Sequence, residues 1–181
     1  PSLPLEVALD FGKNHPCMVV RQVSPFGQVR FLGGILGQEL FLDHFLDICQ
    51  RHLASWFPNA NVQWCCDPAG ASDTSHGTHG AVTILRGKGI YPRYQSDANS
   101  PAVRLAAIEQ MAAQMRLRAS DRSEAFVIAN DPERWLRISA NNIVADKFLA
   151  DGFEAGYVWD ENMVSVGNKQ VRKPKKDGWY E

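Results

Sequence analysis

The chain has 181 residues, enough for one domain with a substantial core, and its 45% hydrophobic and 22% charged residues are typical of globular proteins. The net charge of −1 excludes a protein that is basic throughout, but it allows a local basic strip that binds nucleic acid. No apolar run approaches the roughly 20 residues that a membrane-spanning helix needs. The four cysteines include no CxxC pair, which favours a reducing cytoplasm over a disulfide framework.

The first 60 residues predict three strands and a helix. Strands are expected over residues 5 to 11, 17 to 23 and 28 to 36, and the "SPFG" between the last two is typical of a tight turn. The short links make an antiparallel meander the simplest arrangement of these strands. Apolar positions keep helical spacing over residues 39 to 57, so one face of this helix should pack on the sheet.

The rest of the chain predicts alternating strands and helices. Such alternation favours parallel strands joined by right-handed crossovers. The expected elements are a strand over 61 to 66, a helix over 77 to 87, a short strand over 89 to 94, a helix over 100 to 119 capped by Ser100, a strand over 125 to 129, a helix over 141 to 152, and a hairpin followed by a basic segment in "GYVWDENMVSVGNKQVRKPKK". Together these elements predict an α/β fold with a mixed central sheet flanked by helices.

Two aspartates stand at the ends of apolar strands. Asp10 lies near the end of the first strand, and Asp67 follows "VQWCC" and precedes a "PAG" turn. If the strand over 61 to 66 runs beside the first strand and parallel to it, both carboxylates lie at one edge of the sheet, on strands about 4.8 Å apart. Like charges at that spacing raise one pKa sharply unless a cation lies between them. The pattern therefore predicts a site for one or two divalent cations; the alternative is that Asp67 only caps its own turn.

Four motifs follow one another in a specific order along nearly the whole chain. They are "LDFGKNHPCMVV", then "VQWCCDPAG" after three strands and a helix, then "YQSDANSPAVRLAAIEQM", and finally "GYVW" with "RKPKK" downstream. In this order they resemble the nuclease domain of phage large terminase subunits. The resemblance implies a ribonuclease H-like fold that cuts concatemeric double-stranded DNA during viral genome packaging, at the procapsid in the cytoplasm of the bacterial host.

The resemblance also assigns roles to residues. It implies that Asp10 and Asp67 are catalytic metal ligands for two Mg²⁺ or Mn²⁺ ions, which activate a water molecule and stabilise the leaving oxygen. The third acid of the family lies in a closing helix past the hairpin, and the sequence to Glu181 does not contain it. No GxxxxGK[ST] motif marks the ATPase domain of the family. We therefore expect a single nuclease domain over residues 1 to 181, with residues 1 to 4 as a linker, and no membrane contact. In the full-length protein its partners would be an ATPase domain, the portal and the small terminase subunit.

One dense basic run predicts a contact with DNA. It consists of Lys169, Arg172, Lys173, Lys175 and Lys176. A flexible basic arm of this kind follows the phosphate backbone with salt-dependent, sequence-blind affinity, and the alternative is a solvated tail. Glu39 also has two possible roles. It could be an extra acid near the metals, or it could interact with the dipole of the helix that it begins.

Two functions of other classes remain open. The first is a catalytically silent ribonuclease H-like module that binds DNA or portal, since the third acid is not in the chain. The second is an actin-like ATPase, whose first strand also carries an acid on a three-strand meander. That class needs glycine-rich phosphate loops, and "DFGKNHP" lacks the usual Gly-Thr or Gly-Ser pair. A plasmid-nicking assay with Mn²⁺ and with EDTA distinguishes the three.

Overall fold

The structure is a computed structural model that describes residues 3–12, 14–71, 80–95, 100, 102–103, 106–107, 109–110, 126–151, 159–166 and 169–174. The chain divides into two compact units, Pro1–Asp146 and Lys147–Glu181. The first unit contains the large sheet, and the second contains a two-stranded hairpin.

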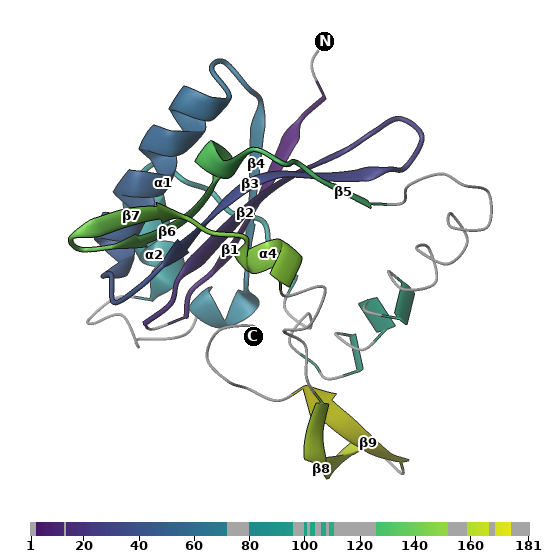
Figure 1. The fold of residues 1–181 in the computed structure, drawn as a ribbon. Helices are drawn as coiled ribbons and strands as arrows, with labels where there is room; N and C mark the ends of the chain where they lie inside the picture. Colours follow the sequence, from purple (N-terminus) through teal and green to yellow (C-terminus); the bar gives the residue numbers. More distant parts are fainter. Residues whose placement is uncertain are drawn as a thin grey trace. The chain divides into compact units, whose positions relative to one another are not determined.

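The described strands of the first unit form one seven-stranded mixed sheet (Figure 1). The strands are β1 (Leu5–Asp10), β2 (Cys17–Val23), β3 (Val29–Gly37), β4 (Val62–Cys66), β5 (Phe126–Ile128), β6 (Trp135–Ser139) and β7 (Asn142–Ala145). Their order is β4-β1-β2-β3-β6-β7, with β5 also paired to β3. Antiparallel pairing joins β1 to β2 and β2 to β3, and β4 runs parallel to β1. The predicted meander, the parallel fourth strand and the mixed α/β sheet are therefore confirmed.

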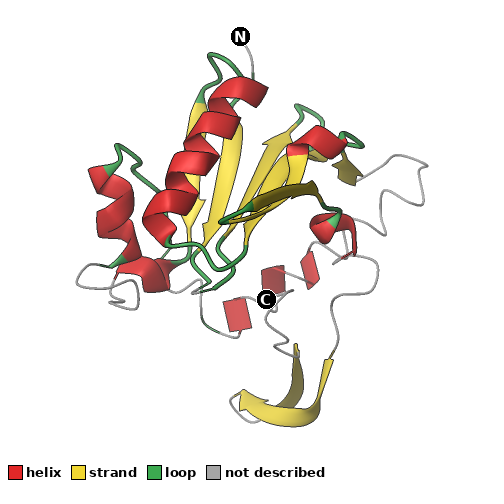
Figure 2. Ribbon diagram, turned by 60° about the vertical axis from the view of Figure 1, so that its left-hand side comes forward, coloured by secondary structure: helices red, strands yellow, loops and turns green. Residues whose placement is uncertain are grey.

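Two helices of the first unit pack on the sheet (Figure 2). They are α1 (Leu42–Trp56) and α2 (Ala81–Gly87), and two short 3-10 turns, η1 (Pro68–Ala71) and η2 (Pro132–Arg134), precede α2 and β6. The helix predicted over 39 to 57 is confirmed, although it begins three residues later than expected. The later part of the helix predicted over 77 to 87 is confirmed by α2.

The core lies between these helices and one face of the sheet. Strand alternation buries Leu5, Val7 and Leu9 of β1, while helical spacing buries Phe45 and Leu46 of α1. Phe45 has 0% of its surface exposed and belongs to the same cluster as Val7. Truncating a fully buried phenylalanine to alanine costs about 3–5 kcal/mol, so this contact is a main source of stability.

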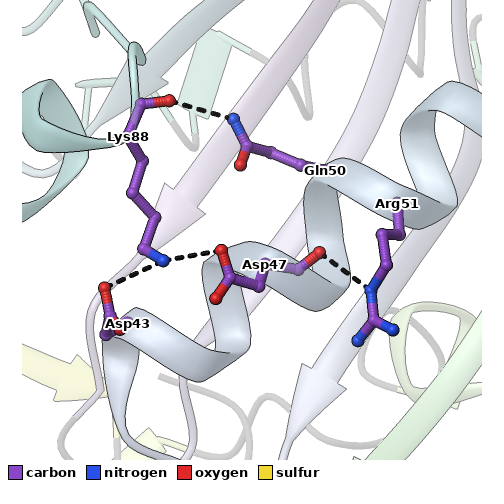
Figure 3. Close-up of polar contacts among 5 residues, drawn as sticks. All are labelled: Asp43, Asp47, Gln50, Arg51 and Lys88. Atoms are coloured by element: carbon purple, nitrogen blue, oxygen red, sulfur yellow. Dashed lines mark hydrogen bonds and ion pairs between the residues drawn. The ribbon is translucent and has the colours of Figure 1, made fainter.

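A lysine after α2 ties the two helices together (Figure 3). The Lys88 ammonium lies 2.9 Å from Asp43 Oδ1 and 2.6 Å from Asp47 Oδ1, and Gln50 Nε2 donates to the Lys88 carbonyl at 3.2 Å. Asp43 and Asp47 are one helical turn apart, so one ammonium reaches both. The hydrogen bond from Lys88 lowers the pKa of Asp47, and the bonds to Asp47 and Asp43 raise the pKa of Lys88. We call Lys88, Asp43 and Asp47 the Lys88 clamp.

The prediction of a helix over residues 141 to 152 is wrong for its first half, where Asn142–Ala145 forms β7. This strand pairs with β6, a strand that was not predicted, across a two-residue turn. The β-branched Ile143 and Val144 favour an extended backbone, and pairing across a short turn overrides the helical spacing of the apolar residues. Helical structure is confined to α4 (Phe148–Asp151) in the second unit.

The predicted strand over residues 89 to 94 is reduced to a single bridge beside β4. The Arg93 N–H donates to the Trp64 carbonyl at 2.8 Å, and the Arg93 carbonyl accepts from the Cys66 N–H at 3.1 Å. Proline is unfavourable within a strand, and no second bridge to β4 is formed by the described residues of this segment. This segment therefore lies parallel to β4 along its outer edge without forming a strand.

Two later predictions are partly covered by the described residues. Most of the helix predicted over 100 to 119 lies outside them, but residues 102–103, 106–107 and 109–110 are helical, and Ser100 Oγ accepts from the Val103 N–H at 3.3 Å as a cap would. The strand predicted over 125 to 129 is confirmed by β5.

The hairpin of the second unit is also confirmed. It consists of β8 (Trp159–Val166) and β9 (Lys169–Pro174), which pair antiparallel. Within the described part of the chain, no helix combines the length and the apolar character that a membrane span needs.

Candidate metal centre

The sheet brings Asp10 and Asp67 to one edge. Asp10 is the last residue of β1, and Asp67 directly follows β4. The parallel register pairs Leu9 with Cys66. Asp10 directly follows Leu9 and Asp67 directly follows Cys66, so the two aspartates occupy matching positions on the two strands. Neighbouring strands of a sheet are about 4.8 Å apart. We call this side of the sheet, where β1, β3, β4 and β6 all end, the carboxyl edge.

Strand alternation sets the direction of Asp10. Leu5, Val7 and Leu9 are buried against the helices, whereas Ala8 and Asp10 are exposed on the opposite face. The carboxylate therefore lies where a solvent-borne cation or phosphate reaches it without displacing core side chains.

The turn η1 orients Asp67, which is half-buried. Its Oδ1 accepts a hydrogen bond from the Ala69 N–H at 2.7 Å, and its carbonyl accepts from the Gly70 N–H at 3.2 Å. The turn-capping role considered from the sequence is therefore present. A carboxylate has about four lone-pair sites on two oxygens, so one such bond does not exclude a second role as a metal ligand.

Gly70 couples the surroundings of the two aspartates. A Cβ atom at this position would lie 2.7 Å from Phe11 Cδ2, would also collide with Phe11 Cε2, and would stand 3.2 Å from Ala81 Cβ at the start of α2. Phe11 follows Asp10, so the residue after one aspartate packs against the turn that carries the other. Only glycine allows this close approach, and the contact holds β1 and η1 at a fixed separation.

Glu39 lies at the carboxyl edge as well, in the connection from β3 to α1. Its N–H donates to the carbonyl of Asn14, in the loop after β1, at 2.7 Å. Its φ of 53° lies in the left-handed region, which costs a residue with a Cβ about 1–2 kcal/mol. The residue precedes α1 by three positions, so the interpretation that it begins this helix is wrong.

The oxygen ligands at this edge suit a hard divalent cation. Across the residues that the structure describes, no group of three or more His, Cys, Asp or Glu side chains could hold a metal ion. Glu39 therefore does not complete a three-ligand site with Asp10 and Asp67. Two carboxylates still fit Mg²⁺ or Mn²⁺, because these ions commonly keep several waters and take one or two protein carboxylates together with substrate phosphates.

Two thiols with raised pKa values lie beside the aspartates at this edge. Burial raises the pKa of Cys17 to about 12, and the Asp10 carboxylate, its cross-strand neighbour, adds to the rise. Burial raises the pKa of Cys66 to about 11, with further contributions from Cys65 and Asp67. Both thiols are therefore protonated at neutral pH. The smaller contributions of Asp10 and Asp67 come from negative charge, which favours the binding of a cation.

The residues predicted to bind DNA belong to the second unit. Lys169, Arg172 and Lys173 lie in β9, so the expectation of a basic arm after the hairpin is wrong for these three. Lys175 and Lys176 lie outside the described residues.

Arg93 is a cationic residue near the acids that the sequence patterns did not single out. It bridges to Cys65, two residues before Asp67, and its Nη1 donates to Gln63 Oε1 at 3.4 Å. The available signal was that Arg93 lies in the short strand predicted over residues 89 to 94.

The candidate metal centre therefore consists of Asp10 and Asp67; Glu39 bonds to the loop after β1, and Arg93 bridges to β4. Comparison of the chain with protein-family models, with curated proteins and with solved structures found no match.

Proposed function

We propose that this chain is a metal-dependent endonuclease domain that hydrolyses phosphodiester bonds in double-stranded DNA, of the kind found in phage large terminase subunits. The observation that carries the proposal is the parallel register of β1 and β4, which brings Asp10 and Asp67 together from distant parts of the sequence. Two carboxylates at the end of adjacent parallel strands suit metal-assisted phosphoryl chemistry better than a purely structural role.

The strand arrangement supports a ribonuclease H-like fold within this proposal. The resemblance to the terminase nuclease domain implies a three-strand antiparallel meander with a fourth strand parallel to the first, and acids on the first and fourth strands. β1 to β4 have this order and these directions. The segment of residues 89 to 94 runs parallel along the outer edge of β4 and extends the same side of the sheet.

In the proposed mechanism, Asp10 and Asp67 would each hold a divalent cation through a carboxylate oxygen. Such ions, when bound, supply an activated water and stabilise the leaving oxygen. Asp10 is exposed, so it leaves room for a phosphate to approach from solvent. The Ala69 N–H fixes one oxygen of Asp67 and thereby the direction of its other oxygen. The contact between Phe11 and Gly70 maintains the separation of the two acids.

The wider context belongs to the proposal too. The full-length protein would join this domain to an ATPase domain and would contact the portal and the small terminase subunit during packaging in the host cytoplasm. The β8–β9 hairpin would contact the DNA backbone through Lys169, Arg172 and Lys173, with Lys175 and Lys176 after it.

A second candidate function is a catalytically silent module that binds DNA or portal. The hydrogen bond from Ala69 to Asp67 favours it, because this carboxylate already has a structural task. The lack of a third acid around the pair, among the residues described here, points in the same direction.

The decisive experiment combines Mn²⁺ titration by calorimetry with plasmid nicking. The wild-type protein should bind Mn²⁺ and nick plasmid DNA, and EDTA should stop the nicking. Asp10→Asn and Asp67→Asn should each abolish Mn²⁺ binding. Glu133→Gln is the matched control, because Glu133 is an exposed acid in η2, which precedes β6 at the other end of that strand.

Mn²⁺ binding that both aspartate variants retain would remove the metal site from the proposal. Metal binding without nicking would favour the silent module, and nicking that EDTA leaves intact would require another chemistry.

A further inference from the structure

A groove lined by both polar and apolar residues lies beside α1, on a different side of the helix from Lys88. It has a volume of about 550 Å³ and separates the outer side of α1 from the turn between β6 and β7. In Figure 3, Lys88 meets α1 on the side of α2, whereas Arg51 extends away from it. The residues that carry the following argument are His44, Arg51, His52, Ser55, Asn141 and Asn142.

The lining of this groove is suited to an anion. Helical spacing aligns His44, Arg51, His52 and Ser55 along one side of α1, and the β6–β7 turn supplies two side-chain amides from the other side. None of the lining residues, all of them in the described part of the chain, is acidic. A chain with 20 acidic residues among 181 thus keeps carboxylates out of this groove, although the exposed surface of α1 carries them elsewhere.

Arg51 provides the permanent charge of the groove. Its Nε donates to the Asp47 carbonyl at 3.3 Å, which orients the guanidinium, and no described carboxylate forms an ion pair with it. The Asp47 carboxylate is bound instead to Lys88 at 2.6 Å. The guanidinium is therefore held in place by a neutral group and has N–H groups in a planar fork that matches phosphate oxygens.

His52 is held in the groove by packing. Its ring lies 5.2 Å from the ring of Trp56, and burial, followed by the charge of Arg51, lowers its pKa. A half-buried imidazole that is neutral at neutral pH donates one hydrogen bond and does not require a counter-ion. The groove thus combines the Arg51 guanidinium with several further hydrogen-bond donors.

The groove and the candidate metal centre both lie toward the carboxyl edge, on different faces of the sheet. One cross-strand row runs from Asp10 through Cys17 and Leu36 to Arg137, and the β6–β7 turn begins three residues after Arg137, at the carboxyl edge. Three strand spacings separate Asp10 from Arg137 along this row, or about 14 Å, and the groove lies beyond Arg137.

We propose that this groove binds a phosphate of a nucleic-acid backbone, at a position separate from the phosphate that meets Asp10 and Asp67. The identity of the polymer rests on the proposed nuclease function, whereas the anion site itself rests on Arg51 and the neutral donors around it. Arg51 would take two phosphate oxygens, and His52, Ser55 and Asn142 would donate further hydrogen bonds.

The test measures DNA binding in EDTA, so that metal binding plays no part. Arg51→Gln should weaken the binding of a labelled duplex about tenfold and reduce the slope of log affinity against log salt by about 0.9, the value for one phosphate. Arg51→Lys should keep the salt slope. Arg86→Gln is the matched control, because Arg86 is an exposed arginine near the end of α2, outside the groove, and should change neither quantity.

Proton NMR of the histidine rings localises the contact. Duplex DNA should shift the ring resonances of His44 and His52 in the wild type, and inorganic phosphate should shift them more weakly. A shift with phosphate but not with DNA would overturn the proposal in favour of a small-anion site. Competition by poly-glutamate as strong as that by DNA would overturn it in favour of an acidic protein partner.

The groove and the metal centre can fail separately. If the Arg51→Gln and Arg86→Gln variants bind DNA equally well, the groove proposal is overturned, whether or not the protein binds Mn²⁺. If Mn²⁺ does not bind but Arg51→Gln still weakens DNA binding, the nuclease proposal fails and the groove stands.

Discussion

Two pairs of aspartates in this molecule show how position decides what a carboxylate does. Asp43 and Asp47 lie one turn apart on α1, and the Lys88 ammonium lies within 3 Å of both. Asp10 and Asp67 come from two strands far apart in the sequence and meet at the carboxyl edge, where burial raises the pKa of neighbouring thiols and the two carboxylates add to the rise. The first pair contains its own cation and joins two helices. The second pair adds to a local negative field, and this is why we assign the candidate metal centre to it.

The largest expected difference between the two pairs is in catalysis. Asp10→Asn or Asp67→Asn should lower the rate of Mn²⁺-dependent plasmid nicking by about a hundredfold or more, because each removes a ligand for the catalytic ions. Lys88→Met, which breaks the other pair, should leave the rate within about twofold. Equal losses in all three variants would mean that the comparison reflects stability alone.

The second expected difference between the two aspartate pairs is in how Mn²⁺ changes the stability of the protein. At a free Mn²⁺ concentration 100 times the dissociation constant, the free energy of unfolding should rise by about 2.7 kcal/mol. Urea titrations should show this increase for the wild type and for Lys88→Met, but not for Asp10→Asn. An increase that survives in Asp10→Asn would place the Mn²⁺ at another site.

The contact between η1 and Phe11 allows a finer test of the second pair. Gly70→Ala should cost about 1–3 kcal/mol of stability by overpacking against the Phe11 ring, and it should also weaken Mn²⁺ binding because it displaces Asp67. Gly87→Ala is the matched control, since a Cβ there meets nothing within 4 Å. Calorimetry of both variants measures the two effects. Intact Mn²⁺ affinity in a destabilised Gly70→Ala would show that η1 does not position the site.

The smallest expected effect is the pH dependence of the Lys88 clamp. The pKa of Asp47 is lowered in the folded state, so its contribution is present above its unfolded pKa of about 4 and is lost as pH falls through the folded value. The pKa of Lys88 is raised, so its contribution is lost only as pH rises above 10.5. Lys88→Met should therefore lose less stability than the wild type between pH 4 and pH 2, as measured by thermal unfolding. Parallel curves for the two proteins would show that the clamp contributes little.

The sequence predicted the first half of this fold better than the second. The strands up to β4 and the helix α1 have clear periodicities and short links, so local patterns determine them, and the parallel placement of β4 followed from the element order. In β6 and β7 the outcome depends on pairing with β3 and with each other, which no local spacing encodes. The helical spacing around Ile143 was therefore misleading.

The candidate site was predictable in part for the same reason. Asp10 and Asp67 are marked by the apolar strands before them, and their meeting follows from one parallel pairing. The close packing of Gly70 on Phe11 and the left-handed backbone of Glu39 depend on atoms brought together only in the folded chain. Arg51 and Asn142 are distant in the sequence and carry no shared motif, so their groove had no sequence signal.

The matched ends of β1 and β4 limit how such a domain can change in length. Successive strand residues face opposite sides of a sheet, so adding a single residue inside β4 would turn Asp67 toward the helices while Asp10 kept its exposed position. An added residue in the "SPFG" turn would leave both carboxylates where they are. Related chains should therefore vary freely in their turns, whereas the lengths of these two strands stay constant.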